Sequence, residues 1–331
     1  MTNKLIRLTV KAPAGAIALL VVLVTAMSPA HAQYPEKEIR LVVPYAPGGS
    51  ATTSARLFAD KLAKELDQKV YVDNKGGASG AIGASFVADA PADGYTLLYS
   101  SAAMMTVNPA LFGEQLKYKV SQFAPIGLAN TFASVLFVNK DFPAKNLKEF
   151  ISYAKSTPGT ITFGSAGPGS SGHLWGELLK NRANIDIRHI PYKGTAPALI
   201  DVIGGRISFV VDAAVAGQEQ LKAGNLRAIA VTSDSRIATL PDLPTFAESG
   251  LKGFEPLNWY GIFGPAGTPK DVVKKINSAI AAVASDTDYK EKLMTLGMGS
   301  IQNSPEQLKA RIESDSNHWG SVIKTAGISI Q

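Results

Sequence analysis

The sequence contains no cysteine and only four histidines among its 331 residues. The lack of cysteine excludes disulfide bonds, thiol catalysis and cysteine-based zinc sites. The histidines lie far apart and form no H-E-x-x-H motif, and the sequence has neither a G-x-S-x-G elbow nor a Walker phosphate loop. We therefore expect a protein that binds without chemistry, with no metal and no cofactor. A secreted α/β enzyme is the remote alternative.

A strongly basic surface is also missing, which argues against nucleic acid as a partner. The formal net charge is +6, from 33 Lys and Arg against 27 Asp and Glu. Three of the basic residues lie in the first 32 positions, so the rest of the chain has only a mild excess. Its charges of both signs are interspersed on predicted helices, which is typical of a solvated surface.

The N-terminus has the three parts of a secretory signal peptide. A basic region reaches Lys11, an apolar core runs from Ala14 to Val24, and Ala30-His31-Ala32 supplies an A-x-A cleavage site. We therefore predict cleavage after Ala32 and location in the periplasm. An uncleaved anchor is the alternative, although the apolar core is short for a membrane span.

The stretch from Leu41 to Leu66 organises the rest of the chain. A β-branched apolar run indicates a buried parallel strand, a Pro47-Gly48-Gly49 turn follows, and hydroxyl residues then open an amphipathic helix. A glycine turn at the start of a helix presents backbone N–H groups to an anion, such as a carboxylate or a phosphate.

The same unit is repeated, which predicts a doubly wound, mostly parallel sheet. A second strand, glycine turn and helix follow, and then a third strand that ends at Ser100-Ser101. These elements are expected at 69–72, 74–80, 81–88 and 95–99. Right-handed crossovers would bring all three turns to one edge of the sheet.

The pattern recurs roughly 120 residues later, so we predict two similar lobes. Strands are expected at 160–163, 186–190 and 207–211, the last one followed by Asp212, with turns at 164–172 and 192–194. Crossings near 131–138 and 258–263 would form a hinge. The predicted division is a signal peptide at 1–32, a first lobe at 33–130 plus 255–331, and a second lobe at 131–254. Further helices are predicted with N-caps at Asn146, Thr268 and Ser304.

Gly167 to Gly172 forms a literal G-x-G-x-x-G between a strand and a helix. A dinucleotide site also needs an acid at the end of the next strand, but that strand ends in Pro191-Tyr192-Lys193. The glycines therefore favour a smaller anion.

Hydroxyl side chains and backbone N–H groups are the predicted ligand contacts. Lys75 and Lys193 follow predicted strands, but each is as typical of a solvated turn as of a ligand site. The candidates are Ser50, Thr52, Ser79, Ser100, Ser101, Ser165, Ser170, Ser171 and Thr195. Each of them is also a plausible helix cap or turn residue.

The chain resembles the extracytoplasmic solute receptors of tripartite tricarboxylate transporters, the Bug or TctC-like proteins. The resemblance runs from about Tyr34 to Ile328 and rests on motifs such as IRLVVPYAPGGS, NKGGASGAIGA, DGYTLLYSS, FGSAGPGSSGHL and WYGIFGPAGTP. It implies two α/β lobes on a hinge (a type II periplasmic binding protein) that close over a small carboxylate. The residues carried over are Tyr45, Gly48, Gly49, Ser50, Thr52, Ser100, Ser101, Ser165, Ala166, Gly167 and Asp212.

Two positions qualify this resemblance. Thr52 stands where relatives often carry an acid, which makes an amino-acid ligand a weaker expectation. Met104 and Met105 follow the third strand and either pack the core or line the pocket beside an apolar part of the ligand.

The predicted function is capture of a small organic acid, a dicarboxylate or an aromatic carboxylate, by hinge closure. The expected partners are the permease subunits of a tripartite membrane transporter, with the receptor acting as a monomer. A receptor that presents its ligand to a sensor kinase is the alternative.

Overall fold

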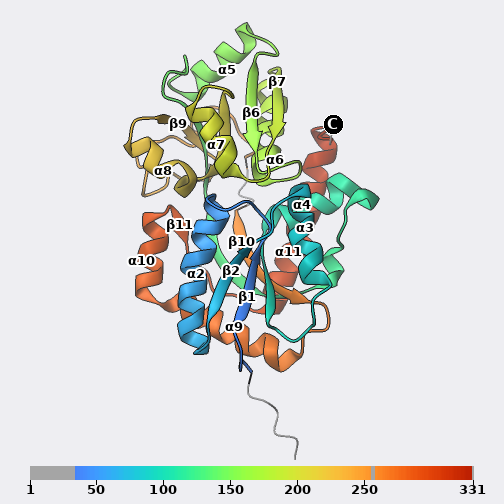
Figure 1. Ribbon diagram of the computed structural model, residues 1–331. Helices are drawn as coiled ribbons and strands as arrows, with labels where there is room; N and C mark the ends of the chain where they lie inside the picture. Colours follow the sequence, from blue (N-terminus) through green and yellow to red (C-terminus); the bar gives the residue numbers. More distant parts are fainter. Residues whose placement is uncertain (1–33, 255–257, 330–331) are drawn as a thin grey trace, which may run out of the picture. The chain divides into compact units, whose positions relative to one another are not determined.

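The computed structural model describes residues 34–254 and 258–329, and residues 37–331 form one compact unit (Figure 1). The predicted signal peptide and its cleavage site lie outside the described residues. The compact unit contains two β-sheets with their own helices, which confirms the α/β class. In the described part of the chain, no helix combines the length and apolar character needed to cross a membrane.

The first sheet has six strands in the order β11-β4-β10-β3-β1-β2. Its strands are β1 (Ile39–Val43), β2 (Val70–Asn74), β3 (Thr96–Ser101), β4 (Phe123–Phe132), β10 (Trp259–Pro265) and β11 (Met298–Gly299). β1 pairs in parallel with β2 and β3, and the other pairings are antiparallel. The apolar run at the start of the organising stretch is β1, in which four of the five residues are buried.

The second sheet has five strands in the order β7-β6-β8-β5-β9. They are β5 (Ser134–Asn139), β6 (Ile161–Ser165), β7 (Ile187–Pro191), β8 (Phe209–Ala213) and β9 (Leu226–Val231). β6 pairs in parallel with β7 and β8, whereas β5 is antiparallel to both β8 and β9.

The two sheets share one arrangement, which confirms the predicted internal repeat. The parallel triplet β3-β1-β2 matches β8-β6-β7, and an antiparallel strand, β10 or β5, follows next to β3 or β8. Each sheet is thus mixed rather than mostly parallel. The reason is that β10 and β5 each enter from the other sheet, and only a crossover within one sheet imposes parallel pairing.

Each sheet carries its own helices, and we call each sheet with its helices a lobe. The first lobe has α2 (Ser50–Leu66), α3 (Ala81–Ala88), α4 (Ala102–Phe112), α9 (Lys270–Ser285), α10 (Thr287–Thr295) and α11 (Pro305–Thr325). The second lobe has α5 (Leu147–Ser156), α6 (Ser171–Ala183), α7 (Thr195–Ile203) and α8 (Ala214–Lys222).

Two of the three predicted N-caps are confirmed. Asn146 accepts the backbone N–H of Glu149, and Ser304 forms a capping box with Gln307. The cap at Thr268 is wrong, because its hydroxyl donates to the carbonyl of Pro265 and Pro269 occupies the N-cap position of α9.

The chain passes between the sheets at two neighbouring places. Ala133 alone separates β4 from β5, and the chain returns to the first sheet at β10. The backbone N–H of Phe132 donates to the carbonyl of Asn258 at 3.0 Å, so the two crossings are hydrogen-bonded to each other.

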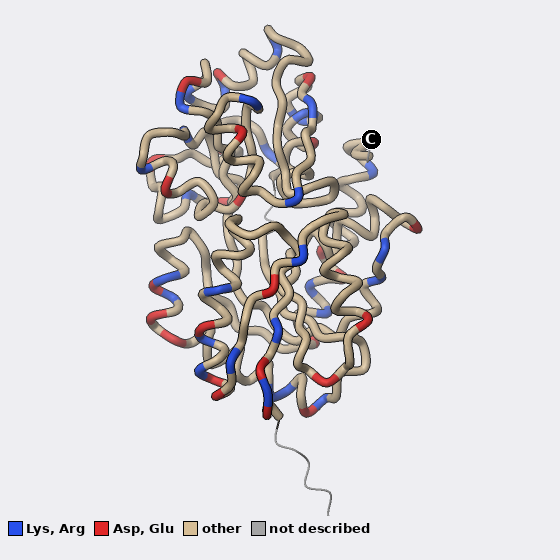
Figure 2. The backbone as a smooth tube through the Cα atoms, in the orientation of Figure 1, with Lys and Arg blue, Asp and Glu red and all other residues tan. Residues whose placement is uncertain are grey.

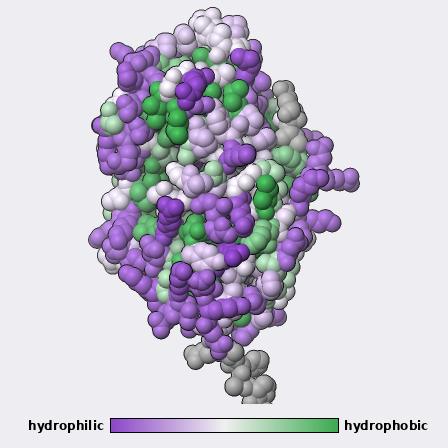
Figure 3. Space-filling view, viewed as in Figure 1, coloured by the Kyte–Doolittle hydropathy of each residue, from purple (hydrophilic) through white to green (hydrophobic). Residues whose placement is uncertain are grey.

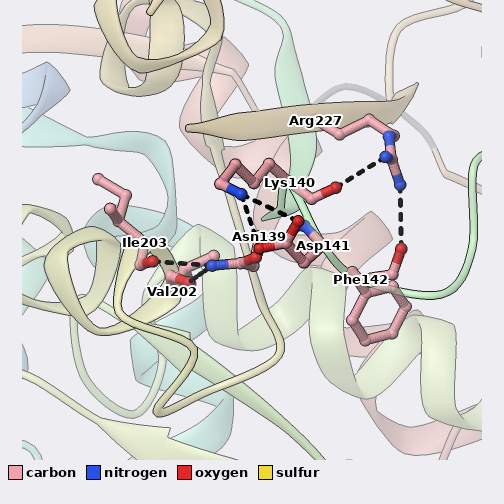
Figure 4. Close-up of polar contacts among 7 residues, drawn as sticks. All are labelled: Asn139, Lys140, Asp141, Phe142, Val202, Ile203 and Arg227. Atoms are coloured by element: carbon pink, nitrogen blue, oxygen red, sulfur yellow. Dashed lines mark hydrogen bonds and ion pairs between the residues drawn. The ribbon is translucent and has the colours of Figure 1, made fainter. Parts of the chain in front are cut away.

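Polar contacts tie the end of β5 to its neighbours (Figure 4). The Asn139 amide donates to the carbonyls of Val202 and Ile203 at the end of α7, and the Arg227 guanidinium donates to the carbonyls of Lys140 and Phe142. These contacts stabilise the second lobe as a unit.

The surface carries both kinds of charge. Lys and Arg are interspersed with Asp and Glu along the backbone (Figure 2), and the face seen in Figure 3 mixes hydrophilic and hydrophobic residues. This distribution is consistent with a mild charge excess and a solvated surface.

Candidate functional site

A small cavity lies where the turns of the two lobes meet. Its volume is about 40 Å³, enough for about two or three water molecules. Its lining combines small, hydroxyl and aromatic residues: Tyr45, Ala46, Gly49, Ser50, Ala51, Ser101, Phe132, Ala166, Ser170, Ser171, Gly172, Thr195, Asp212 and Tyr260.

Several helices begin at this cavity. The first residues of α2, α6 and α7 line it, as do Ser101, which directly precedes α4, and Asp212, which stands two residues before α8. The first N–H groups of a helix have no acceptor inside the helix, and the helix dipole adds partial positive charge there. Because these starts follow the carboxyl ends of parallel strands, the fold itself directs N–H groups toward an anion.

Asp212 is the one charged residue in the lining. Its carboxylate accepts the hydroxyl of Ser50 at 3.0 and 3.1 Å, the backbone N–H of Ala213 at 2.8 Å, and the side chain of Thr195. Burial raises the pKa of Asp212, and these three donors partly oppose the rise. The contact with Ser50 joins the second lobe to the first.

Two tyrosines supply further hydroxyls. The Tyr45 and Ser101 hydroxyl oxygens lie 2.8 Å apart, and the Tyr260 hydroxyl lies 3.3 Å from that of Ser50. Burial raises the pKa of Tyr45 to about 12 and raises that of Tyr260 as well, so both phenols stay protonated at neutral pH. The Tyr260 ring stacks on Phe132 at 4.8 Å.

The structure brings together more than half of the residues that the sequence singles out. Those that line the cavity are Tyr45, Gly49, Ser50, Ser101, Ala166, Ser170, Ser171, Thr195 and Asp212. Those outside its lining are Gly48, Thr52, Ser79, Ser100, Ser165 and Gly167.

Thr52 points to a neighbour in its own lobe. Its hydroxyl oxygen accepts the side-chain amide of Asn74 at 2.8 Å, and the residue is 1% exposed. The same Asn74 amide donates to the carbonyl of Tyr45. Thr52 therefore supports the first turn from below instead of lining the cavity. Ser100 is likewise buried, and its hydroxyl donates to the Ser101 carbonyl.

Ser165 belongs to a histidine cluster in the second lobe. Its hydroxyl oxygen lies 2.6 Å from Nε2 of His189, and it accepts the backbone N–H of Gly167. The ring centroids of His173 and His189 lie 4.2 Å apart with the rings tilted, and Nδ1 of His173 accepts the backbone N–H of Gly169. This cluster fixes the shape of the glycine turn from behind. Ser170 lines the cavity and also caps α6.

The remaining predicted residues lie beside the cavity or in the core. Ser79 and Gly167 line a neighbouring recess of about 610 Å³ together with Lys193, and Gly48 lines another of about 430 Å³. Lys75 is 3.4 Å from the carboxylate of Asp73. Met104 and Met105 are buried in α4 and do not line the cavity, which favours the packing interpretation.

Phe132 and Tyr260 are lining residues to which the hydroxyl and glycine pattern gives no clue. Both lie on strands that cross between the lobes. The W-Y-G-I-F-G-P motif at the return crossing was the available signal for Tyr260. Among the described residues, no group of three or more His, Asp or Glu is placed to hold a metal ion.

The lobes are in contact on both sides of the cavity. The backbone N–H of Ala46 donates to the carbonyl of Lys193 at 3.1 Å. The side chain of Gln218 donates to the Thr295 carbonyl, and that of Asn181 to the Ala326 carbonyl. With the bond from Ser50 to Asp212, these contacts hold the lobes together around the cavity.

Comparison with known proteins finds a matching family and similar solved structures. Residues 54–328 match the model of a family described as "TctC: Tripartite tricarboxylate transporter family receptor". Among solved structures, the periplasmic binding protein BugD is 38% identical, with a TM-score of 0.86, over 90% of this chain and 100% of that one.

Two further structures contain small carboxylates. Rpa4515 of R. palustris with adipate is 35% identical, with a TM-score of 0.86, over 89% of this chain and 99% of that one. MatC (Rpa3494) from Rhodopseudomonas palustris with bound malate is 32% identical, with a TM-score of 0.83, over 88% of this chain and 100% of that one.

Proposed function

The chain belongs to the TctC family of tripartite tricarboxylate transporter receptors, and from this premise we propose that it captures a small organic carboxylate in the periplasm and delivers it to a tripartite membrane transporter. The observation that carries the proposal is the cavity between the lobes. The starts of several helices line it, and its lining contains no Lys or Arg. Such a site suits an anion held by backbone N–H and hydroxyl groups.

Ligand size follows from what similar proteins hold. The adipate and malate of the two R. palustris proteins are short dicarboxylates. We propose a dicarboxylate of this size for the present chain. The alternative is an aromatic carboxylate with a phenyl ring, and the rings of Phe132 and Tyr260 at the cavity support it.

The proposed ligand contacts divide into two groups. Direct contacts come from the residues that line the cavity: Tyr45, Gly49, Ser50, Ser101, Ala166, Ser170, Thr195 and Asp212, with Phe132 and Tyr260 added. Gly48, Thr52, Ser79, Ser100, Ser165 and Gly167 shape the turns around them.

We propose that binding involves hinge motion of two lobes, at 33–130 plus 255–331 and at 131–254, after removal of residues 1–32 as a signal peptide. The lining of the cavity comes from both lobes, so we propose that the lobes separate to admit the ligand and close around it. The contacts from Ala46 to Lys193 and from Ser50 to Asp212 would then break and re-form. The receptor is proposed to act as a monomer and without turnover of its ligand.

The test is calorimetry of protein purified from the periplasm against short dicarboxylates and phenyl carboxylates, with neutral sugars as controls. We expect saturable binding of at least one carboxylate and no binding of sugars, and mass spectrometry of the recovered ligand should find it unchanged. Binding of sugars alone would refute the carboxylate assignment. Ligand uptake by cells that lack this gene should fall if the partner is a transporter.

A further inference from the structure

The candidate cavity contains a charge that a carboxylate ligand has to accommodate. Asp212 lines it, and no Lys, Arg or His stands among the lining residues to neutralise it. A carboxylate ion bound there would lie near a second negative charge, and charges interact strongly where water is largely excluded. The positive ends of the helix dipoles stabilise an anion, but they stabilise Asp212 as well as the ligand carboxylate.

The hydrogen bonds of Asp212 leave acceptor capacity on its carboxylate. An ionised carboxylate has about four acceptor positions. Ser50 approaches the two oxygens at 3.0 and 3.1 Å, so one hydroxyl proton is shared between two positions. Ala213 and Thr195 supply the other donors. A ligand that displaces or supplements Ser50 can therefore donate to Asp212.

The other hydroxyls in the cavity are able to turn toward the ligand carboxylate. The Tyr45 and Ser101 hydroxyls bond to each other at 2.8 Å, and each can rotate its proton to an acceptor. Asp212, in contrast, can only accept when it is ionised. The cavity thus offers donors for the carboxylate and one strong acceptor beside them.

We propose that Asp212 recognises a hydrogen-bond donor carried near the ligand carboxylate, a hydroxyl or an ammonium group, and so selects hydroxy acids or amino acids over unsubstituted carboxylic acids. This inference rests on the proposed function, because it assumes that a carboxylate binds in this cavity. It also revises the expectation that Thr52 makes an amino-acid ligand a weaker candidate. The acid that is absent from the first turn at Thr52 is present in the second lobe as Asp212.

The experiment compares ligands that differ in one substituent. Succinate, malate and aspartate share a four-carbon dicarboxylate skeleton and carry hydrogen, hydroxyl and ammonium at the same carbon. Calorimetry at pH 7.5 on protein purified from the periplasm should find malate or aspartate bound at least tenfold more tightly than succinate, because a hydrogen bond to a charged acceptor is worth about that factor or more. The series phenylacetate, mandelate and phenylglycine makes the same comparison for phenyl-sized ligands.

Asp212→Asn removes the charge and keeps the shape. In this variant the preference should fall below threefold, because the charged acceptor for the ligand substituent is removed. Asp141→Asn is the matched control, since Asp141 is an exposed carboxylate of the same lobe that pairs with Lys140 (Figure 4). Ser50→Ala removes a competitor for the Asp212 oxygens and should leave the preference at least as large as in the wild type.

The outcomes separate the two proposals. Carboxylate binding with equal affinity across a series, or a preference that survives Asp212→Asn, overturns the role of Asp212 while the carboxylate receptor stands. If Asp212→Asn does not fold, a preference that falls in Ser50→Ala overturns it instead. Sugar binding without carboxylate binding removes the proposed function and this inference with it. The member of the series that binds most tightly tells a hydroxyl from an ammonium group.

Discussion

Acidification should destabilise this protein through two neutral histidines in the second lobe. His173 is 4% exposed, and its Nδ1 accepts the Gly169 N–H, which requires Nδ1 to be unprotonated. Burial lowers the pKa of His173 to about 3, with a further contribution from His189, whose own pKa burial lowers to about 4. Glu177 is 4.0 Å from His173 Nε2, which is too far to offset the cost of burying a charge.

The sign and size follow from linkage. The unfolded chain binds protons at these histidines near their ordinary pKa of about 6.5, while the folded chain excludes them until the pH reaches 3 to 4. Stability is therefore complete above pH 6.5 and falls as the pH decreases toward 3. At pH 5 the loss is about 2 kcal/mol for each histidine, a large share of a typical total of about 5–15 kcal/mol.

The unfolding measurements should stop at pH 5, because other groups titrate below that pH. Lys61 lowers the pKa values of Asp286 and Asp288, so these carboxylates destabilise the fold only at lower pH. Burial raises the pKa values of Glu177 and Asp212, and their protonation acts in the opposite direction. Variants that lack the histidines therefore isolate the histidine contribution, because Glu177 and Asp212 are common to all of them.

The assay is urea unfolding at pH 7.5 and at pH 5. Asn at position 173 keeps an acceptor near the position of Nδ1, and Gln at position 189 keeps a partner for Ser165 near that of Nε2. Over this range the wild type should lose about 4 kcal/mol more than the double variant, and each of His173→Asn and His189→Gln about 2 kcal/mol more than the double variant. His318→Gln on the exposed face of α11 is the control. An equal loss in the wild type and the double variant would refute the reasoning.

Three shorter predictions concern closure and the second lobe. A methyl group at Gly49 would lie 3.7 Å from the Ala196 nitrogen, which is an ordinary contact distance. Calorimetry should therefore find that Gly49→Ala binds the ligand within about threefold of the wild-type affinity, while the larger side chain of Gly49→Val lowers the affinity at least tenfold. Equal affinities of the two variants would contradict this. A methyl group at Gly76 would lie 3.2 Å from the Lys193 carbonyl of the second lobe, and 2.7 Å from the Ala46 nitrogen of its own lobe. Gly76→Ala should therefore displace the first turn and weaken its contact with the second lobe, and X-ray scattering that finds the same ligand-induced compaction as in wild type would exclude the idea. Asn139→Ala leaves the two carbonyls at the end of α7 without their amide donor and should cost about 1–3 kcal/mol in urea unfolding, whereas no change would mean that water replaces the amide.

The repeated strand-turn-helix pattern was enough to predict the fold class and the duplication. It works because the buried parallel strand at β1 and the amphipathic helix α2 are local signals, and the glycine turn between them has few alternatives. The antiparallel placement of β10 was not accessible in the same way. Pairing of β10 with β3 joins segments more than 150 residues apart, and no local property of either strand records it.

The candidate lining residues could be predicted where they lie in turns or at the edge of a sheet, but not where they lie inside a strand. Gly49 lies in the turn after β1, Ser50 directly follows it as the first residue of α2, and Asp212 is the next-to-last residue of β8. Topology alone brings such positions to one edge. Tyr260 lies inside a strand that reads as core, so its role depends on which partner strand it meets. Thr52 is outside the lining of the cavity, because its helical position turns the hydroxyl to Asn74, and no spacing in the sequence predicts that contact.

The charge balance of the cavity decides what kind of acid it can hold. Two charges about 5 Å apart repel by about 3 kcal/mol at an effective dielectric constant of 20, so Asp212 opposes a ligand carboxylate by roughly that amount. Each helix start returns about 0.3–1 kcal/mol to a nearby anion, so α2, α6 and α7 together return about 0.9–3 kcal/mol and do not exceed the repulsion. A donor from the ligand to Asp212 adds about 1.5–3 kcal/mol, which is the largest remaining contribution. Selectivity in such a site comes from the substituent beside the carboxylate, because the attraction for the carboxylate itself is largely cancelled.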